Sequence, residues 1–303
     1  MQKLELLVCV DLYHSATAKL ADYIIAPTLS LERDDVTMLT DTWYDEPYCH
    51  YTRAVLPKNP ESLEEWELYW ELSHRTGVAL TLPGGTLDSG TRPSKFDVLA
   101  LLMPESQIPL KTIAEIGQGH IFQAVQVKVE PPRAGQTDRF QLLPTDIAEQ
   151  LQTVAGETYW QQQGNVDEGV TYSHLLISRR LKHVYNSSGQ QLDALKQKGT
   201  TNPAYMHPSD LSAAGLISGQ LIEVSSAAGA LVGVVEAAAD IKPGVISMAH
   251  AWGDLPDNGG EVRTQGSSTN RLVDDDRTFD SITGMPRMSA IPVNIRLVQE
   301  AVA

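Results

Sequence analysis

A basic segment follows the apolar run Tyr172–Ser178 in a sequence that is otherwise acidic. Its charged and imidazole side chains are Arg179, Arg180, Lys182 and His183. Guanidinium and ammonium groups form charge-assisted hydrogen bonds to phosphate oxygens, so the segment is suited to the pyrophosphate of a cofactor. The hydroxyl of Ser178, at the end of the run, belongs to the same candidate set. The alternative interpretation is a solvated basic turn that balances neighbouring acids.

Asn186 and Asp11 are two further candidates for ligand binding, and each has a second interpretation. Asn186 precedes Ser187-Ser188-Gly189 and either contacts a ligand or occupies a left-handed turn. Asp11 follows an apolar run, and ligands of α/β proteins bind at the carboxyl ends of parallel strands. Its carboxylate could equally hold the turn that comes next.

Polar side chains also follow the apolar run Val245–Ala249. His250 and Trp252 come directly before a Gly253 turn and could hydrogen-bond the edge of a heterocyclic ring. Alternatively, the two side chains cap the fold beneath them, a common position for tryptophan. Asn270 offers a donor and an acceptor, the pairing that recognises such an edge, and Ser267, Ser268 and Thr269 add hydroxyls just before it.

The sequence predicts no metal ligands and no catalytic residue. His207-Pro208-x-Asp210 looks like a metal motif, but proline at the first helical position and an acid in the first turn explain it as a helix start. His174 and His183 do not have metal-ligand spacing. Cys9 and Cys49 are the only cysteines, too few for an iron–sulfur cluster or a structural zinc. We expect them to be reduced, buried or inert.

The stretch 202–254 predicts the element order that would position these groups. A short helix begins at Pro208 and ends at Gly215. Short runs rich in β-branched residues follow, separated by turn residues, at Leu221–Val224, Ala230–Val235 and Val245–Ala249. With Tyr172–Ser178 before them and Ile291–Val298 after them, these runs predict a small β-barrel or a sandwich.

Several motifs in this region, in order, resemble the molybdopterin oxidoreductases, the family of dimethyl-sulfoxide reductase, nitrate reductase and formate dehydrogenase. They are Asn202-Pro203, His207-Pro208-x-Asp210, Gly215, Gly219-x-Leu221-Ile222-x-Val224, Gly229, Pro243-Gly244, His250-x-Trp252-Gly253, Asn270-x-Leu272 and Thr283-Gly284-x-Pro286. The resemblance implies a double-psi β-barrel that closes over molybdopterin guanine dinucleotide. It also implies that the loop after Ser178, Asn270 and the turn at Gly284 contact the cofactor. Arg287 stands where family members often have a lysine.

The N-terminal part predicts an α/β arrangement. Leu4–Val10 reads as a strand buried on both faces, Ala16–Ala21 as a short helix and Tyr23–Ala26 as a second, parallel strand. Residues 11–18, 21–27 and 31–32 resemble the end of the Rossmann-like domain of the same family. The fold class is therefore α/β followed by mainly β. We predict domains at 1–165, a partial Rossmann-like domain with a helical excursion, and at 166–303, the dinucleotide-binding barrel.

Between these parts we expect a polar and aromatic surface excursion at 37–60 and a connector at 80–90. Ser62-x-x-Glu65 predicts a capping box, with Leu63, Trp66 and Trp70 on one helix face, Gly77 at the helix end and the five glutamates between Glu61 and Glu71 on a solvated face. Further elements are expected at Phe96–Met103, Gln107–Ile116 and Thr145–Val154 (helices) and at Val125–Val129 (strand). Connectors are expected at 131–138 and at 161–169, where the domain boundary falls.

Composition limits the functional class. A net charge of −15 argues against nucleic acid, and no apolar run is long enough to span a bilayer. The N-terminus reads as a strand inside a fold and not as a signal peptide. A cytoplasmic location is favoured, and a periplasmic one would need an upstream twin-arginine signal. The sequence does not indicate the substrate.

Two hypotheses follow from the resemblance. In the first, the chain is the C-terminal segment of an oxidoreductase, whose iron–sulfur cluster and molybdenum ligand lie in an N-terminal remainder and which passes electrons to a partner. In the second, it is a non-catalytic subunit that docks onto a separate catalytic chain. A weaker third reading is a barrel adapted only for protein contacts.

Overall fold

The computed structural model describes residues 1, 3–124, 131, 133–156, 165–167, 169–196, 201–254 and 262–298. The chain divides into two compact units, Met1–Thr137 and Asp138–Ala303, which are described separately below. All barrel strands lie within the predicted domain 166–303, while the domain boundary itself stays a prediction. The predicted strand Val125–Val129 and most of the predicted boundary segment lie outside the described residues.

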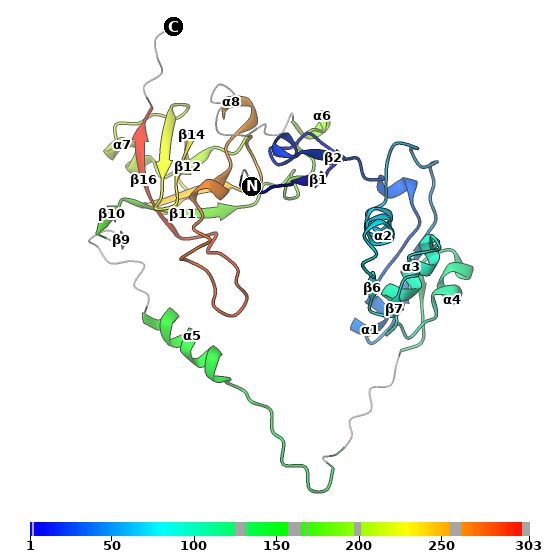
Figure 1. Ribbon diagram of the computed structural model, residues 1–303. Helices are drawn as coiled ribbons and strands as arrows, with labels where there is room; N and C mark the ends of the chain where they lie inside the picture. The colour runs from blue at the N-terminus through cyan, green and yellow to red at the C-terminus, as the bar shows by residue number, and fades with distance from the viewer. Residues whose placement is uncertain are drawn as a thin grey trace. The chain divides into compact units, whose positions relative to one another are not determined.

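A closed β-barrel of six strands dominates the second unit (Figure 1). Its strands are β11 (His174–Arg179), β12 (Ala204–Met206), β13 (Leu221–Ser225), β14 (Ala230–Ala237), β15 (Val245–Ala249) and β16 (Ile291–Leu297). Around the barrel the order is β11-β15-β12-β14-β13-β16. The pairs β11–β15 and β12–β14 are parallel, and the other pairs are antiparallel. Of the two predicted architectures, the barrel is therefore confirmed.

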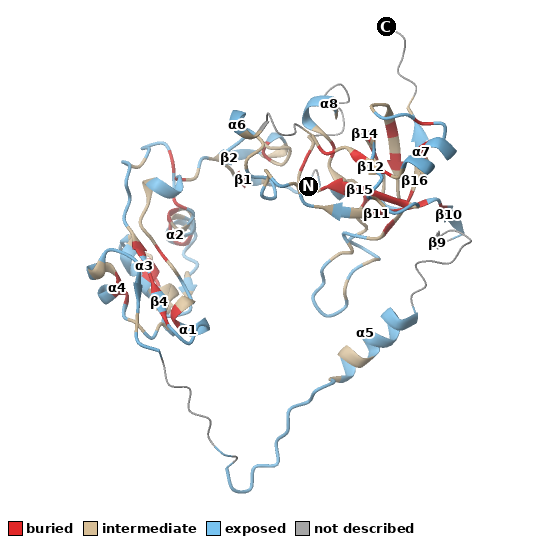
Figure 2. Ribbon diagram, turned by 180° about the vertical axis from the view of Figure 1, so that it is seen from behind, coloured by how far each residue is buried: buried red, intermediate tan, exposed pale blue. Residues whose placement is uncertain are grey.

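Alternating side chains fill the interior of the barrel. In β13 and β14 every second residue points inward, as in a strand with one buried face. Strand β15 is buried along its whole length, including the polar Ser247 at its centre. Figure 2 shows this buried material along the barrel strands. One cluster results: Leu176, Ala204, Met206, Leu211, Leu216, Ile222, Val224, Leu231, Val235, Ile246, Met248, Leu272, Ile291 and Val293.

The helix beside the barrel begins and ends as predicted. In α7 (Pro208–Ala213) the ring of His207 caps the start, because its Nδ1 accepts from the backbone N–H of Ser209 at 3.1 Å. Gly215 follows the helix with a φ of +65°, a conformation that glycine adopts with little strain. The second unit also contains α5 (Thr145–Gly156), β9 (Asn165–Asp167), β10 (Val170–Tyr172), α6 (Asp193–Lys196), α8 (Val262–Gln265) and the 3-10 helix η3 (Thr269–Leu272).

The first unit opens with a parallel pair of short strands. Strand β1 (Val8–Val10), the 3-10 helix η1 (Ala18–Leu20) and strand β2 (Tyr23–Ile25) follow the predicted order. The prediction of a strand buried on both faces is wrong in the described chain. Only Cys9 of β1 is buried, whereas Val8 and Val10 are 42% and 38% exposed, because β1 has β2 as its one neighbour.

The rest of the first unit contains more regular structure than predicted. Segment 37–60 holds parts of short antiparallel pairs instead of a purely irregular excursion, and the predicted connector at 80–90 is a hairpin. The elements are η2 (Ser30–Glu32), β3 (Asp35–Val36), α1 (Thr40–Trp43), β4 (Tyr48–Cys49), β5 (Tyr51–Thr52), α2 (Glu65–Thr76), β6 (Thr81–Leu82), β7 (Gly85–Thr86), α3 (Lys95–Leu102), α4 (Leu110–Ile116) and β8 (His120–Ile121).

The glutamates at the start of α2 are a correction to the sequence prediction. The capping box is formed by Glu64 and Glu67, whereas the hydroxyl of Ser62 donates to the carbonyl of Asn59. Glu64 and Glu67 are buried, each only 8% exposed, and do not lie on a solvated face. Their partners explain this burial, since a buried carboxylate needs paired cations: Lys95 for Glu64, and Lys58 and Arg92 for Glu67.

Both cysteines are free and buried, as expected. Within the described residues, no helix is long and apolar enough to cross a membrane.

Candidate functional site

The parallel pairing of β11 and β15 brings the two predicted site segments together. Arg179 is in register with Ala249, so the chain leaves both strands at the same edge, with Arg180 and His250 next along. A shallow hollow lies at this edge, lined by Arg179, Arg180, Leu181, Val184, Asn186, Ala249, His250 and Trp252. The carboxyl ends of parallel strands are where α/β proteins bind ligands, and this barrel edge repeats that arrangement locally.

A hydrogen-bond network connects four of the predicted residues in this region. The Oδ1 of Asn186 accepts from Arg180 Nη1 at 2.8 Å and lies 3.0 Å from His250 Nε2. On the other side of the imidazole ring, Ser178 Oγ lies 3.4 Å from Nδ1. Asn186 has a φ of +53°, so it is a left-handed turn residue and also a side-chain contact of the site. The network fixes the directions of the Arg180 and His250 donors.

The indole N–H of Trp252 is a buried hydrogen-bond donor. Its side chain is 6% exposed, and its Nε1 is buried without a hydrogen-bond partner among the described residues. Leaving such a donor unpaired costs about 1–3 kcal/mol. Trp252 lines the hollow together with Arg180 and His250, and its indole N–H is a donor whose hydrogen bond is not made within the described residues.

The backbone between His250 and Trp252 is strained. Ala251 has a φ of +65°, a left-handed conformation that costs a residue with a Cβ about 1–2 kcal/mol. The side-chain amide of Gln190 donates to the carbonyl of Ala251 and supports this turn. Strained residues of this kind concentrate at ligand sites, where the surrounding structure holds them.

The other members of the basic segment do not join the network. The guanidinium of Arg179 lies 4.2 Å from the ring centroid of Tyr205, in a cation–π contact with β12. Lys182 is exposed and His183 is half-buried. The segment therefore divides into an anchored part, which holds Arg180 and Asn186, and a solvated part, which corresponds to the alternative interpretation.

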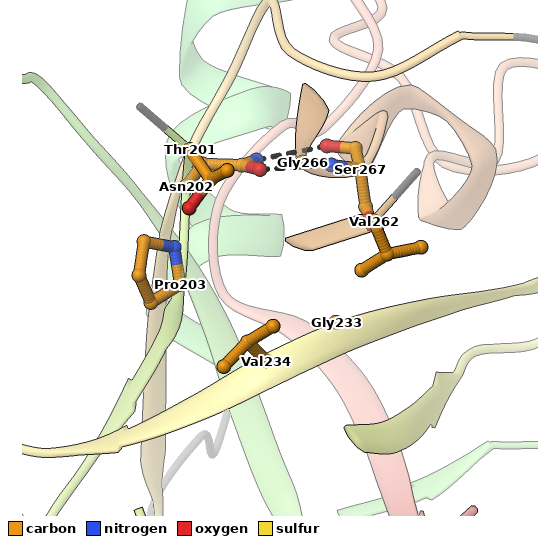
Figure 3. Close-up of a pocket in the computed structure, with 8 residues that line it drawn as sticks. All are labelled: Thr201, Asn202, Pro203, Gly233, Val234, Val262, Gly266 and Ser267. Atoms are coloured by element: carbon orange, nitrogen blue, oxygen red, sulfur yellow. Dashed lines mark hydrogen bonds between the residues drawn. The ribbon is translucent and has the colours of Figure 1, made fainter. Parts of the chain in front are cut away.

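Asn202, for which the sequence predicted no individual role, lies two residues before β12. It is 2% exposed, and its side chain hydrogen-bonds to Ala249 at the end of β15 and to Ser267 in the segment that leads to η3. Figure 3 shows the contact with Ser267. Asn270 lies in η3 and is exposed, with its amide unpaired within the described part of the chain. The only signal for Asn202 was its place in the Asn202-Pro203 motif, since hydrogen bonds to distant carbonyls leave no local pattern.

Three other predicted residues lie outside the lining of the hollow. Gly284 has a φ of +69°, and its N–H donates to Asp280; the N–H of Arg287 donates to Thr278, which closes the same loop. Asp11 accepts from the hydroxyl of Ser15 at 2.7 Å and from the N–H of Tyr13 at 3.3 Å. Its carboxylate therefore holds the following turn, the alternative noted above. For all three residues, cofactor binding stays a prediction.

The histidines that resemble metal ligands have structural partners. No group of three or more His, Cys, Asp or Glu residues that could hold a metal ion occurs among the described residues. His207 caps α7, and His174 is a buried residue at the opposite end of β11, 3.9 Å from Asp210. Burial lowers the pKa of His174, and the charge of Asp210 opposes that shift.

Comparison with known proteins identifies the barrel. Residues 175–292, a range that begins in β11 and ends in β16, match the Molydopterin dinucleotide binding domain. The resemblance recognised in the sequence, to the C-terminal part of molybdopterin oxidoreductases, is confirmed.

Two particular relatives support this assignment. Trimethylamine-N-oxide reductase of Haemophilus influenzae is 22% identical over 280 residues, which cover 84% of this chain and 33% of the relative. The structure of acetylene hydratase from Pelobacter acetylenicus has a TM-score of 0.63 at 17% identity, and the match covers 97% of this chain and 40% of the hydratase. The chain thus spans about a third of the curated relative and two fifths of the solved structure.

Proposed function

We propose that the chain binds molybdopterin guanine dinucleotide at the hollow beside β11 and β15, as the C-terminal cofactor-binding segment of an oxidoreductase. One observation carries this proposal: Trp252 lines the hollow with Arg180 and His250, and its buried Nε1–H has no hydrogen-bond partner in the part of the chain that the structure describes. A pterin or guanine ring edge carries acceptors for such a donor. Phosphate oxygens carry acceptors for a guanidinium.

The residues of the site fit the chemistry of a dinucleotide. Arg180 provides charge for the pyrophosphate in a chain of net charge −15, and Ser178 provides a hydroxyl. His250, Trp252 and Asn270 provide donors and acceptors for ring edges. Lys182, His183, Gly284 and Arg287 would contribute from the surrounding loops. When bound, the cofactor supplies the electron chemistry through its molybdenum, while the protein binds and orients it.

The proposal includes the topology of the barrel and the fold of the N-terminal unit. Two parallel pairs within one six-stranded barrel support a double-psi topology. A parallel β1–β2 pair connected through η1 supports a partial Rossmann-like domain.

The catalytic and electron-transfer parts of the enzyme are proposed to lie on other polypeptide. The chain spans about a third of the curated relative and two fifths of the solved structure, so we assign the molybdenum ligand, any iron–sulfur cluster and the substrate funnel to an N-terminal remainder or a separate catalytic chain. The exposed apolar strands β1 and β2 support a partner at the first unit. The whole enzyme would carry out oxygen-atom transfer or formate-type hydride transfer.

The test measures pterin nucleotide in the purified chain, after expression in a host that makes the cofactor. Oxidised pterin is quantified by fluorescence. We expect Trp252→Phe to lower retention about tenfold, because one hydrogen bond is worth about 1.4 kcal/mol. Trp43→Phe is the matched control, since Trp43 is 72% exposed. Equal retention in both variants, or none in the wild type, would contradict the proposal.

A second experiment separates the segment from the stand-alone subunit. An open reading frame that continues upstream of Met1, with cysteine motifs ahead, favours the segment, whereas a stop codon and ribosome-binding site directly before Met1 favour the subunit. Robust viologen-coupled activity of the purified chain alone would contradict both.

A further inference from the structure

Asn202 uses its side-chain amide completely. Its Nδ2 donates to the carbonyl of Ala249 at 2.6 Å and to that of Ser267 at 2.8 Å, while its Oδ1 accepts from the N–H of Ser267 at 2.8 Å. Both donors and the acceptor thus meet groups of the opposite type. The amide can satisfy all three contacts in one orientation only.

The two tied loops carry the site. Ala249 directly precedes His250 and stands three residues before Trp252, while Ser267 stands three residues before Asn270. Figure 3 shows Asn202 and Ser267 joined in this way above Gly233 and Val234 of β14. The hydroxyl of Ser267 in turn donates to the carbonyl of Val232, which fastens the second loop to the barrel wall.

Two glycines show how closely the loops approach. A Cβ at Gly266 would lie 2.2 Å from Asn202 Oδ1, and a Cβ at Gly253 would lie 2.5 Å from the backbone nitrogen of Ser268. Both glycines have positive φ, at +73° and +88°. The loop at 253 thus packs against the loop at 267–268 backbone to backbone, and the side chain of Asn202 bonds to both of the tied segments.

We infer that Asn202 is a positioning residue that sets the spacing between the loop of His250 and Trp252 and the loop of Asn270. The inference rests on the proposed function, and it adds a residue that does not itself line the Trp252 hollow. A site that binds through donors on two loops needs them held within about 0.5 Å, so loss of the tie weakens binding even where the barrel stays folded.

The matched control is Asn294 on β16. Its amide makes the same kind of tie, because Nδ2 donates to the carbonyl of Thr171 at 3.1 Å and Oδ1 accepts from the N–H of Ser173 at 3.0 Å. These contacts lie at the amino end of β11, the end opposite to Arg180. Asn294→Asp therefore makes the same chemical change away from the proposed site.

The experiment compares Asn202→Asp, Asn202→Ala and Asn294→Asp with the wild-type chain. Asp cannot donate to the two carbonyls, and Ala removes the tie without adding a charge. Pterin nucleotide retention is measured by fluorescence, and hydrogen exchange is measured by mass spectrometry in peptides covering 249–254 and 266–272. We expect both Asn202 variants to retain at least tenfold less cofactor and to exchange at least tenfold faster in these peptides, with unchanged exchange in the barrel strands. Asn294→Asp is expected to resemble the wild type in both measurements.

Each outcome distinguishes the two claims. Normal retention and exchange in Asn202→Ala would overturn the inference. Faster exchange throughout the barrel would also overturn it, since Asn202 would then be a stability residue. A wild-type chain without pterin nucleotide would overturn the proposed function, while the exchange measurement would still show whether Asn202 holds the two loops.

Discussion

The barrel has no unpaired strand edges, whereas the sheets of the N-terminal unit do. Each of the six barrel strands has a neighbour on both sides, so the barrel has no open edge. In the described part of Met1–Thr137, the strands form only two-stranded sheets. A two-stranded sheet is marginal by itself, so its stability has to come from what packs around it.

The apolar core of the barrel is also larger than that of the N-terminal unit. Among the described residues, the barrel unit has one apolar cluster of fourteen buried residues, whereas the first unit has two separate clusters of six and three. The first unit also buries Glu64 and Glu67 with cations and leaves apolar side chains of β1 and β2 exposed. The closed barrel can therefore hold a binding site rigidly, while the first unit relies in part on buried ion pairs.

The sharpest test of this comparison is one truncation in each core. Ile222 in the barrel is 0% exposed, and we expect Ile222→Ala to lower the free energy of unfolding by about 2–5 kcal/mol, through lost burial and a cavity. Ile113→Ala in the smaller cluster is expected to cost less, because its surroundings can collapse around the cavity. Urea unfolding followed by tryptophan fluorescence measures both losses, and a larger loss for Ile113→Ala would reverse the comparison.

A glycine pair tests how tightly the barrel loops are packed. Gly266→Ala is expected to cost about 2–4 kcal/mol, because the new Cβ collides with Asn202 and the residue has a positive φ. Gly244→Ala is the control, with a φ of +80° and no neighbour within 4 Å of the new Cβ, and it is expected to cost about 1 kcal/mol. Equal thermal midpoints for the two variants would show that the loops can move apart.

A neutral substitution tests the ion pairs of the first unit. Burial by itself raises the pKa of Glu67, but the hydrogen bond from Lys58, the N–H of Glu64 and the charges of Lys58 and Arg92 outweigh it and lower the pKa. We expect Glu67→Gln to lower the free energy of unfolding by about 1–3 kcal/mol, in the transition of this unit only. Glu71→Gln, at the exposed Arg75 pair, should change it by less than about 0.5 kcal/mol. A Glu67 variant as stable as the wild type would refute a structural role.

The smallest expected effect is the pH dependence of stability that arises from His174 at the start of β11. Because burial lowers the pKa of His174 in the folded state, the unfolded chain binds the proton more readily. The stabilisation is therefore fully present above the unfolded pKa of about 6.5 and is lost as pH falls through the lowered folded value. We expect the thermal midpoint to fall between pH 7 and pH 5, and to fall less in His174→Gln. Identical slopes for the two proteins would contradict this assignment.

The parts of the fold that depend on local sequence were predictable. Pro208 and Gly215 identified the start and end of α7, and alternation identified β13 and β14. Strand β12 was missed because Ala204–Met206 is too short to show a period. Burial of Glu64 and Glu67 was missed because their cations, Lys58, Arg92 and Lys95, come from elsewhere in the chain.

The candidate site was predictable in composition but not in geometry. The sequence identified Arg180, Asn186, His250 and Trp252 as candidates. The structure joins the first three in one network, and within the described residues the N–H of Trp252 has no partner.

The sequence by itself determined where helices begin and strands alternate, because proline, glycine and apolar spacing act on neighbouring residues. It also determined the resemblance to the molybdopterin oxidoreductases, since that rests on motifs in order. Only the tertiary structure decided that Arg180 lies beside His250, and that Asn202 reaches carbonyls 47 and 65 residues further along the chain. Those contacts follow from the register in which β11 pairs with β15 and the barrel closes, and strand register is a property of the assembled sheet that no single segment encodes.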